Sequence, residues 1–381
     1  MKKILLVHNN YRLQGGEDIA VKNELKLLEK KYQVKSIFFE NKIESFNDIF
    51  AFFTFNNRTS NKKILNTVDE FKPDIVYFHN NWFKVSVGIF KKLRKKNIKV
   101  IIKLHNFRYH CTKSFGANVH LENNNFCHAC GFDKSESKLF NKYYRESLLK
   151  SIYAIFFGKK YLQIIKDTNI YLAVLTNFHK KFLEENYYRK KNVVVIPNFL
   201  DKNENEELEE NFFIYAGRIS KEKGVDTLID SFLNSNLKNN ILKIVGDGPQ
   251  LNYVKEKYTE KNIVFLGQIS NRETIELIKK SKGVISATKL YEGQPTLLCE
   301  ASLCGKVSLF PNSGGIAEFL PKDYEFTFDQ FNYKDLIDKL NLLNNEILRK
   351  NNSKKAKEFI IFKLDENNII QQFNQVINEN E

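Results

Sequence analysis

The sequence contains few of the residues that interrupt regular secondary structure. Only 6 of its 381 residues are proline and 16 are glycine, whereas 42% are hydrophobic. This composition excludes a low-complexity or disordered chain. One hydrophobic core rarely serves a chain of this length, so we expect a globular protein with two domains.

Long apolar runs are also missing. No stretch approaches the roughly 18 apolar residues of a membrane span. The run from Ile4 to Val7 is too short for the central region of a signal peptide. We therefore expect a cytoplasmic protein whose five cysteines are thiols or metal ligands rather than disulfides.

Positive charge belongs to the first half of the chain. Residues 1–200 hold 36 lysines and arginines against 17 acidic residues, a net +19, and residues 201–381 hold 24 against 28, a net −4. Such a basic half attracts nucleic acid, anionic lipid or an acidic substrate. Because no helix-turn-helix, RNA-binding sheet or paired-histidine zinc-finger pattern is present, we expect no nucleic-acid partner.

Two segments concentrate this positive charge, residues 91–99 and 141–166. The second mixes Tyr, Phe and Ile with lysines and an arginine. It suits contact with an anionic membrane, and it equally suits a helix with one buried and one solvated face.

Short runs rich in valine and isoleucine alternate with helical patterns along the chain. Continuous apolar strands separated by helices are typical of parallel sheets buried on both faces, so the expected fold class is α/β. The expected strands span residues 2–8, 32–40, 73–80, 99–106, 170–177, 192–198, 212–218, 241–248, 262–268, 282–288 and 305–311.

A polar, acidic stretch after Pro197 separates two series of strands. We expect a Rossmann-like domain at 1–200 and a second at 206–364, with a C-terminal helix at about 365–381 packing back on the first. Two such domains would face each other across a cleft. Ligands of open α/β sheets bind beyond the carboxyl ends of the strands.

Loops after these strands carry residues suited to an anion. Gly15 and Gly16 precede a helix, where N–H groups and the helix dipole favour a phosphate, although glycine pairs also make plain flexible turns. Arg218 and Lys223 share one loop, and two cations suit a diphosphate or simply a solvated basic turn. Gly246 lies in the tight turn "VGDGP", which lacks the dinucleotide pattern G-x-G-x-x-G.

The stretch "YEGQPTLLCE" places Glu292 in a loop and Glu300 on the helix that follows. Pro295 fits the first turn of that helix, whose N–H groups would face an anion. Hydroxyls at both ends and a diphosphate between them, as in a sugar nucleotide, match these donors and acceptors.

In combination, these motifs resemble glycosyltransferase family 4, retaining enzymes of the GT-B fold. The resemblance runs along nearly the whole chain, through the glycine pair, "KLHN", "VIPN", "GRISKEKG", "VGDGP", the E-x7-E of Glu292 and Glu300, and "SGGIAEF". It implies transfer of a sugar from a nucleotide sugar, with UDP or GDP as carrier, to a lipid-linked or oligosaccharide acceptor in surface-polysaccharide synthesis. The enzyme would work at the inner face of the plasma membrane. A sugar-nucleotide epimerase or phosphorylase of the same fold is the first alternative, and a basic nucleic-acid-binding protein is the second.

The resemblance also implies roles for single residues. Arg218 and Lys223 would neutralise the departing diphosphate. Glu292 would contact the transferred sugar, and His105 would lie near the reacting sugar and the acceptor. Glu300 would hold the ribose. The remaining donor-binding positions would be Gly15, Gly16, Gly217, Gly246, Gln294, Pro295, Thr296 and Leu297. No D-x-D triplet occurs, which fits catalysis by protein cations without a metal cofactor.

Three cysteines, Cys111, Cys127 and Cys130, fall in one segment that is also rich in histidine. A C-x2-C pair with a third cysteine is compatible with structural zinc, and equally with reduced thiols packed in a loop. The spacing does not identify a fourth ligand.

Overall fold

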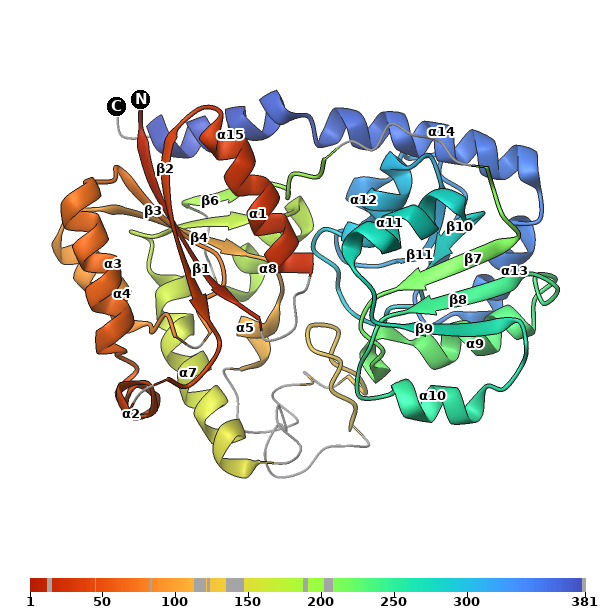
Figure 1. Cartoon of the computed structure of the whole chain (residues 1–381), viewed down its shortest axis with the longest axis horizontal. Coiled ribbons are helices and arrows are strands. Elements are labelled where there is room, and N and C mark those ends of the chain that lie inside the picture. Colours follow the sequence, from red (N-terminus) through yellow and green to blue (C-terminus); the bar gives the residue numbers. More distant parts are fainter. Residues whose placement is uncertain are drawn as a thin grey trace. The chain divides into compact units, whose positions relative to one another are not determined.

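The computed structural model describes residues 1–11, 16–44, 46–82, 84–112, 121, 124–134, 147–187, 191–201 and 208–378. The chain divides into two compact units, Met1–Phe199 with Asp365–Glu381, and Leu200–Leu364 (Figure 1). Each unit contains a parallel sheet of six strands flanked by helices. The α/β fold class predicted from the sequence is confirmed.

In the first unit the strand order is β2-β1-β3-β4-β5-β6, and every pair is parallel. The strands are β1 (Lys3–Asn10), β2 (Gln33–Glu40), β3 (Ile75–Phe78), β4 (Lys99–Leu104), β5 (Tyr171–Val174) and β6 (Val193–Val195). The helices are α1 (Gly16–Glu29), α2 (Phe46–Thr54), α3 (Arg58–Phe71), α4 (Gly88–Lys95), α5 (Arg108–Cys111), α7 (Leu148–Lys166), α8 (Asn177–Tyr187) and α15 (Glu366–Asn378).

Alternate residues of each strand enter two separate cores. On β1, Ile4 and Leu6 belong to the core shared with α1 and α15, whereas Leu5 and Val7 belong to the core on the opposite face. All four are fully buried. Burying such a side chain stabilises the fold by about 1.5–3 kcal/mol. The continuous apolar runs in the sequence therefore reflect a sheet covered on both faces.

The last helix, α15, packs against the first unit. The Tyr32 hydroxyl donates to Asn374 Oδ1 at 2.8 Å, and the ring of Phe373 meets Tyr77 edge-on with centroids 5.1 Å apart. The chain breaks its helix before this point, since α14 (Glu346–Lys363) ends two residues before Asp365 and α15 begins one residue after it. A short break at Leu364 and Asp365 thus separates the two helices.

A buried ion pair lies inside the first unit. Lys103 on β4 donates to Glu24 Oε2 of α1 at 2.7 Å, and both side chains are fully buried. The Tyr77 hydroxyl donates to the other oxygen, Glu24 Oε1, at 2.8 Å. Each charge inside this core is therefore satisfied by a direct partner.

In the second unit the strand order is β12-β11-β10-β7-β8-β9, again parallel throughout. The strands are β7 (Phe212–Ala216), β8 (Ile241–Val245), β9 (Ile263–Gly267), β10 (Gly283–Ile285), β11 (Val307–Asn312) and β12 (Thr327–Asp329). The helices besides α14 are α9 (Val225–Leu233), α10 (Leu251–Lys257), α11 (Asn271–Lys280), α12 (Thr296–Leu303) and α13 (Tyr333–Leu342), with short 3-10 turns at Lys221–Lys223 and Ile316–Phe319.

Helix starts in this unit follow the local chemistry of the sequence. Ser270 and Glu273 form a capping box at α11, and asparagine side chains cap the two later helices α13 and α14.

All eleven expected strands are present. The edge strand β12 was not predicted, because only one side chain of its three residues is buried. Among the residues that the structure describes, no helix is both long and apolar enough to cross a membrane.

Loss of Lys103 should destabilise the first unit strongly. Lys103→Ala leaves the Glu24 carboxylate buried without its cation, so we expect the free energy of unfolding to fall by about 3–5 kcal/mol. Urea unfolding followed by the fluorescence of Trp82, the only tryptophan, reports on this unit.

The matched control breaks an exposed pair of the same unit. Lys30 contacts Glu366 at 2.6 Å with side chains 54% and 31% exposed, so Lys30→Ala should cost at most about 1 kcal/mol. Equal losses in the two variants would contradict the expected role of burial.

Candidate active site

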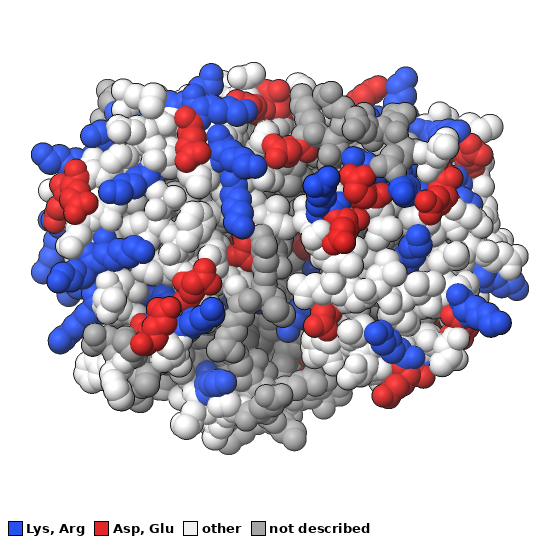
Figure 2. Space-filling view, viewed as in Figure 1, with Lys and Arg blue, Asp and Glu red and all other residues white. Residues whose placement is uncertain are grey.

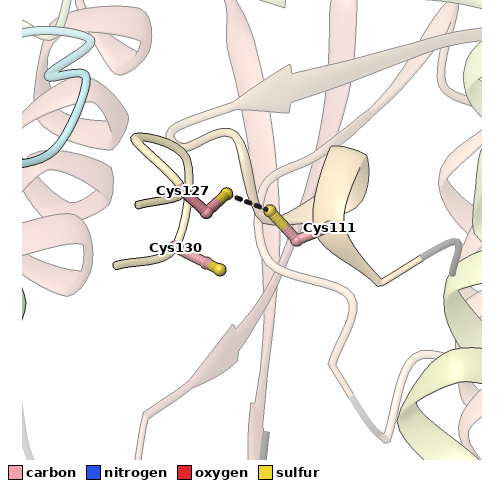
Figure 3. A group of neighbouring side chains, drawn as sticks. All are labelled: Cys111, Cys127 and Cys130. Carbon is pink, nitrogen blue, oxygen red and sulfur yellow. Dashed lines mark hydrogen bonds between the residues drawn. The ribbon is translucent and has the colours of Figure 1, made fainter. Parts of the chain in front are cut away.

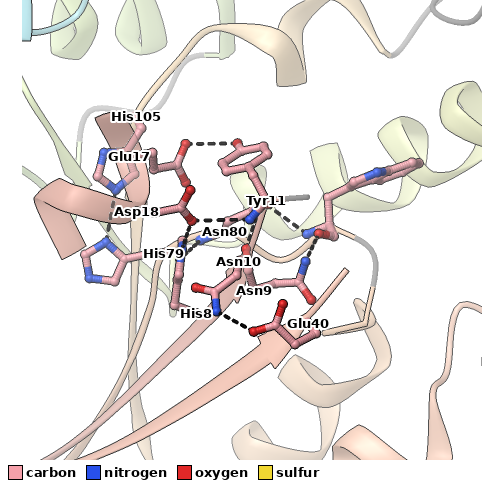
Figure 4. A network of polar contacts seen from close by, with 11 residues as sticks. His8, Asn9, Asn10, Tyr11, Glu17, Asp18, Glu40, His79, Asn80 and His105 are labelled. Atoms are coloured by element: carbon pink, nitrogen blue, oxygen red, sulfur yellow. Dashed lines mark hydrogen bonds and ion pairs between the residues drawn. The ribbon is translucent and has the colours of Figure 1, made fainter. Parts of the chain in front are cut away.

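Three histidines lie at the carboxyl ends of neighbouring strands in the first unit. His8 is on β1, His79 directly follows β3, and His105 directly follows β4. Nδ1 of His79 lies 3.0 Å from Nε2 of His105, and the two rings stack (Figure 4). Nε2 of His79 is buried and has no hydrogen-bond partner among the described residues. The sheet thus places an imidazole ladder at the edge where ligands of α/β folds bind.

The first turn of α1 supplies two carboxylates to this network. Nε2 of His8 lies 2.9 Å from Asp18 Oδ1, which also accepts from the N–H of Tyr11 at 3.2 Å. The Tyr11 hydroxyl donates to Glu17 Oε2 at 3.0 Å (Figure 4). The N–H of Asn80 points at His8 Nδ1, 3.4 Å away. This assigns the acceptor role to Nδ1 and the proton to Nε2, which donates it to Asp18.

Burial sets the charge of these groups. It lowers the pKa of His79 well below its usual value, with His105 the next cause, and it lowers the pKa of His105 similarly, with Lys103 next. Both imidazoles are therefore neutral near pH 7. Burial also raises the pKa of Glu17, partly offset by His8. His79 and His105 therefore offer hydrogen bonds rather than positive charge.

Of this network, sequence reasoning had singled out His105 alone. His8, Asp18 and His79 were missed, although the sequence holds a signal for two of them. A His-Asn pair follows the apolar run of each of the three strands, at 8–9, 79–80 and 105–106. Asp18 had no such signal, because its position in the first turn of α1 is apparent only once the helix is placed. Gly15 lies outside the described residues, and Gly16 opens α1 as an exposed residue.

In the second unit, glycines join the ends of three strands. Gly217 donates to the carbonyl of Val245 at 3.0 Å, and Gly246 donates to that of Gly267 at 2.8 Å. A Cβ on Gly246, whose φ is +132°, would lie 1.9 Å from the Gly217 carbonyl oxygen. No side chain fits there. The loops after β7, β8 and β9 are consequently locked together.

Lys223 and Glu292 form an ion pair. Nζ of Lys223 donates to Glu292 Oε1 at 2.6 Å, with the two side chains 28% and 20% exposed. The Thr288 hydroxyl donates to the same oxygen at 3.1 Å. Lys223 and Glu292 are 69 positions apart in sequence. Sequence reasoning had given them separate roles, on the diphosphate and on the sugar, and had not foreseen their contact.

The loops that carry this pair interlock through two more glycines. Gly224, with φ +63°, lies so close to the Ala287 carbonyl that a Cβ would approach it to 2.2 Å, and the N–H of Lys289 donates to the Glu222 carbonyl. Gly314 is pressed against the backbone of Glu292. The motif "SGGIAEF" therefore supports the Glu292 loop by close backbone packing.

Arg218 and Glu300 are the other two charged residues that the sequence assigned to the donor site in the second unit. Arg218 is exposed, and its guanidinium has no ion-pair partner among the described residues; the Tyr215 hydroxyl donates to its carbonyl at 3.0 Å. Glu300 lies on α12 and accepts from Asn271 Nδ2 at 3.1 Å. Burial raises the pKa of Glu300 to about 7, and the Asn271 bond partly opposes it.

Helix α12 begins one residue later than expected. Pro295 is the N-cap, so it precedes the first turn rather than lying in it, and no side chain caps the helix. Thr296 and Leu297 form the first turn, and Gln294 just before it is buried. An uncapped N-terminus leaves backbone donors for an anion.

These observations converge on a sugar-transfer enzyme, and comparison with known families agrees. Residues 198–359 match the family described as glycosyl transferases group 1. This part of the chain is a glycosyl transferases group 1 domain. It contains Arg218, Lys223, Glu292 and Glu300.

Relatives in sequence include an uncharacterised glycosyltransferase of Methanocaldococcus jannaschii, 26% identical over 308 residues that cover 75% of this chain and 70% of that protein. The amylovoran biosynthesis glycosyltransferase AmsD of Erwinia amylovora is 29% identical over 192 residues, covering 47% of this chain and 54% of AmsD. Anabaena HepE, solved with UDP and glucose, aligns over 100% of both chains with a TM-score of 0.68 and 16% identity. The chain has the GT-B fold.

The raised pKa of Glu300 predicts that this carboxylate lowers the free energy of unfolding by an amount that depends on pH. A folded pKa near 7 against an unfolded value of 4.5 means that the native state binds more protons between these values, so Glu300 destabilises the fold increasingly as pH rises through this window. The stability of Glu300→Gln relative to the natural chain should therefore rise from pH 5 to pH 8 in thermal unfolding.

A nearby glutamate provides the contrasting variant. Hydrogen bonds from Ser270 hold the pKa of Glu273 below its usual value. This group is ionised in both states above pH 5, so the effect of Glu273→Gln should stay constant over the same range. A flat pH response of Glu300→Gln would show that the carboxylate is well solvated.

Proposed function

We propose that this protein is a retaining glycosyltransferase that moves a sugar from a UDP- or GDP-sugar to a lipid-linked or polysaccharide-repeat acceptor in surface-polysaccharide synthesis. The observation that carries this proposal is the Lys223–Glu292 pair, fixed by interlocked glycine loops in a glycosyl transferases group 1 domain. An epimerase or phosphorylase has no observation of its own in its favour.

Charge in the second unit supports a diphosphate-bearing donor. Arg218 presents a planar guanidinium that can grip two oxygens, and Lys223 presents an ammonium already held in place by Glu292. Developing negative charge on a departing diphosphate would be stabilised by such preorganised cations. No dedicated carboxylate base or metal cofactor is needed for a leaving phosphate that takes the acceptor's proton.

The other end of the donor would be recognised by α12. The N–H groups of Thr296 and Leu297 suit phosphate or sugar oxygens, and Glu300 suits the ribose hydroxyls when it is ionised. Glu292, held by Lys223 and Thr288, retains its second oxygen for a sugar hydroxyl. A relative of the same fold has been solved with UDP and glucose, which supports a nucleotide-sugar donor for this chain.

The histidine network of the first unit suits the acceptor side. A neutral His105 can donate or accept a hydrogen bond with a sugar hydroxyl, and the His79 nitrogen behind it fixes the orientation of its ring. The kinship with AmsD, named for amylovoran biosynthesis, supports a polysaccharide-building role.

Removing either donor-site cation should abolish most of the transfer. A thermal-shift screen against UDP, GDP, ADP, CMP and dTDP, with their sugars, first identifies the donor, since a ligand of the folded state raises its stability. With that donor, Arg218→Ala and Lys223→Ala should each lower turnover by about 100-fold or more.

Lys221 lies in the same turn as Lys223 and offers a matched control, because Lys221→Ala removes an equal charge and retains the lysine of the Lys223–Glu292 pair. Full activity of Lys223→Ala, or equal losses in both lysine variants, would overturn the assigned donor site.

We also propose that the first unit contacts an anionic membrane. Its helices α2 and α7 expose large apolar side chains: Phe46 is 90% exposed and Leu149 is 79% exposed. The two helices are linked where Phe55, just after α2, stacks on Tyr153 of α7 with centroids 5.7 Å apart. Lys and Arg side chains are frequent on the part of Figure 2 where α3 and α4 lie. Apolar anchors with surrounding cations are typical of interfacial binding.

Loss of these anchors should weaken membrane binding. In sedimentation with phosphatidylglycerol vesicles, the double variant Phe46→Ser/Leu149→Ser should bind about tenfold or more weakly, because each buried side chain contributes about 1.5–3 kcal/mol. Ile347→Ser removes an apolar side chain of similar exposure from the second unit, 74%, and should bind as the natural chain does. Unchanged binding of the double variant would contradict contact through α2 and α7.

A further inference from the structure

Three of the five cysteines lie close together in the first unit. The sulfur atoms of Cys111, Cys127 and Cys130 all lie within 4.8 Å of one another (Figure 3). Cys111 Sγ and Cys127 Sγ are 3.4 Å apart, and no disulfide joins the cysteines. Cys111 and Cys127 are buried, and Cys130 is partly buried. Cys127 and Cys130, which follow Cys111 by 16 and 19 residues, thus direct their thiols to the same place as Cys111 does.

A tight hairpin presents two of these thiols. The bridge between Phe126 and Asp133 closes it, the N–H of Cys127 donates to the Phe132 carbonyl at 2.8 Å, and Gly131 donates to the Cys127 carbonyl at 2.7 Å. Gly131 has φ +79°, which a residue with a side chain rarely adopts. This turn brings both cysteines of the C-x2-C pair to the same side, the arrangement that structural zinc sites use.

The third thiol is supplied by an anchored helix. Cys111 ends α5, where Tyr109 hydrogen bonds to His179 Nε2 at 3.0 Å and His110 Nδ1 to the Tyr187 hydroxyl at 2.8 Å, both on α8. At Gly158 of α7, a Cβ would lie 2.2 Å from the Thr112 carbonyl oxygen, so α5 ends in close contact with α7. Cys111 is therefore held in place independently of the hairpin.

The sulfur positions fit a tetrahedral ion. With zinc–sulfur bonds of about 2.3 Å, tetrahedral geometry separates the sulfurs by about 3.8 Å. The observed 3.4 Å contact and the 4.8 Å limit lie on either side of this value. Small shifts of side chains would bring all three onto one ion.

The surroundings show why a cation would stabilise this segment. Among the residues that the structure describes, the buried cluster around these cysteines consists of Leu121, Cys111 and Cys127, with Ala129, Cys130 and Phe132 packed against it. So small an apolar cluster contributes little to holding a hairpin, and segments without an adequate core commonly depend on a metal or a disulfide. Cys299 and Cys304, in contrast, lie within the large core of the second unit.

We propose that Cys111, Cys127 and Cys130 bind one structural zinc ion as thiolates. Among the described residues no further histidine, aspartate or glutamate joins this group, so these three sulfurs are the protein ligands that the structure assigns. A water molecule completes the tetrahedron. The ion ties the C-x2-C hairpin to α5, six residues after His105, and so fixes the loop that follows β4.

Metal analysis of the full-length protein tests this site. Elemental analysis by mass spectrometry should find about one zinc per chain, the stoichiometry of a single three-thiolate site. Cys111→Ala and Cys130→Ala should each lose most of the zinc, and Cys304→Ala, which removes a buried thiol from the other unit, should retain it. Zinc retained by all the cysteine variants, or protein that carries no zinc even after purification and refilling with zinc salts, would overturn the proposal.

A second measurement uses the natural chain alone, so it does not depend on the folding of a variant. Alkylation mapped by mass spectrometry should spare Cys111, Cys127 and Cys130 until a chelator is added, while the reactivity of Cys299 and Cys304 stays unchanged. Replacement by cobalt should give the visible spectrum of a tetrahedral thiolate site. Chelator-independent alkylation would contradict the site, as would iron with acid-labile sulfide in its place.

Discussion

The organisation of both units depends on one constraint: parallel strands all end at the same edge of their sheet. Strands β1, β3 and β4 are neighbours, so the residues that follow them meet, and His8, His79 and His105 form a ladder although they are far apart in sequence. In the second unit the same constraint gathers the loops after β7, β8, β9 and β10. A chain that alternates buried strands with helices therefore has its chemistry concentrated at these edges before any particular residue is chosen.

In the second unit, close contacts between backbone segments hold the loops at the end of the sheet in fixed positions. Gly246 lies against the Gly217 carbonyl, Gly224 against that of Ala287, and Gly314 against the Glu292 backbone. Each contact excludes even a methyl group, so the loops have little freedom to shift relative to one another. A flexible lysine side chain can then be held 2.6 Å from its partner without a rigid stem of its own. Glycine is scarce in this sequence, and several of the glycines it has are placed at these contacts.

Features that depend on local sequence patterns, such as strands, could be predicted from the sequence. Contacts between residues far apart in the chain could not. Apolar runs predicted eleven strands, most clearly those such as β1 and β3 that are buried on both faces. Strand β12 was missed because it is three residues long with one buried side chain. The order of the motifs predicted separate roles for Lys223 and Glu292. Their contact could not be predicted from the sequence, because it depends on how two loops 69 residues apart pack together. His79 was passed over for the opposite reason: its signal, a repeated His-Asn pair at strand ends, was present but was read at one strand only.

The electrostatics of the first unit limits what its histidines can do. Lys103 is buried beneath them and held by Glu24, and its charge, added to burial, lowers the pKa of His105. A protonated His105 would place a second cation near this buried ammonium at a considerable energetic cost. Neutral His79 and His105 can offer hydrogen bonds to a ligand but cannot neutralise its negative charge. In the proposed reaction the groups that neutralise negative charge are Arg218 and Lys223, one exposed and the other held by an ion pair. His79 and His105 are therefore neutral although the first half of the chain carries a net charge of +19.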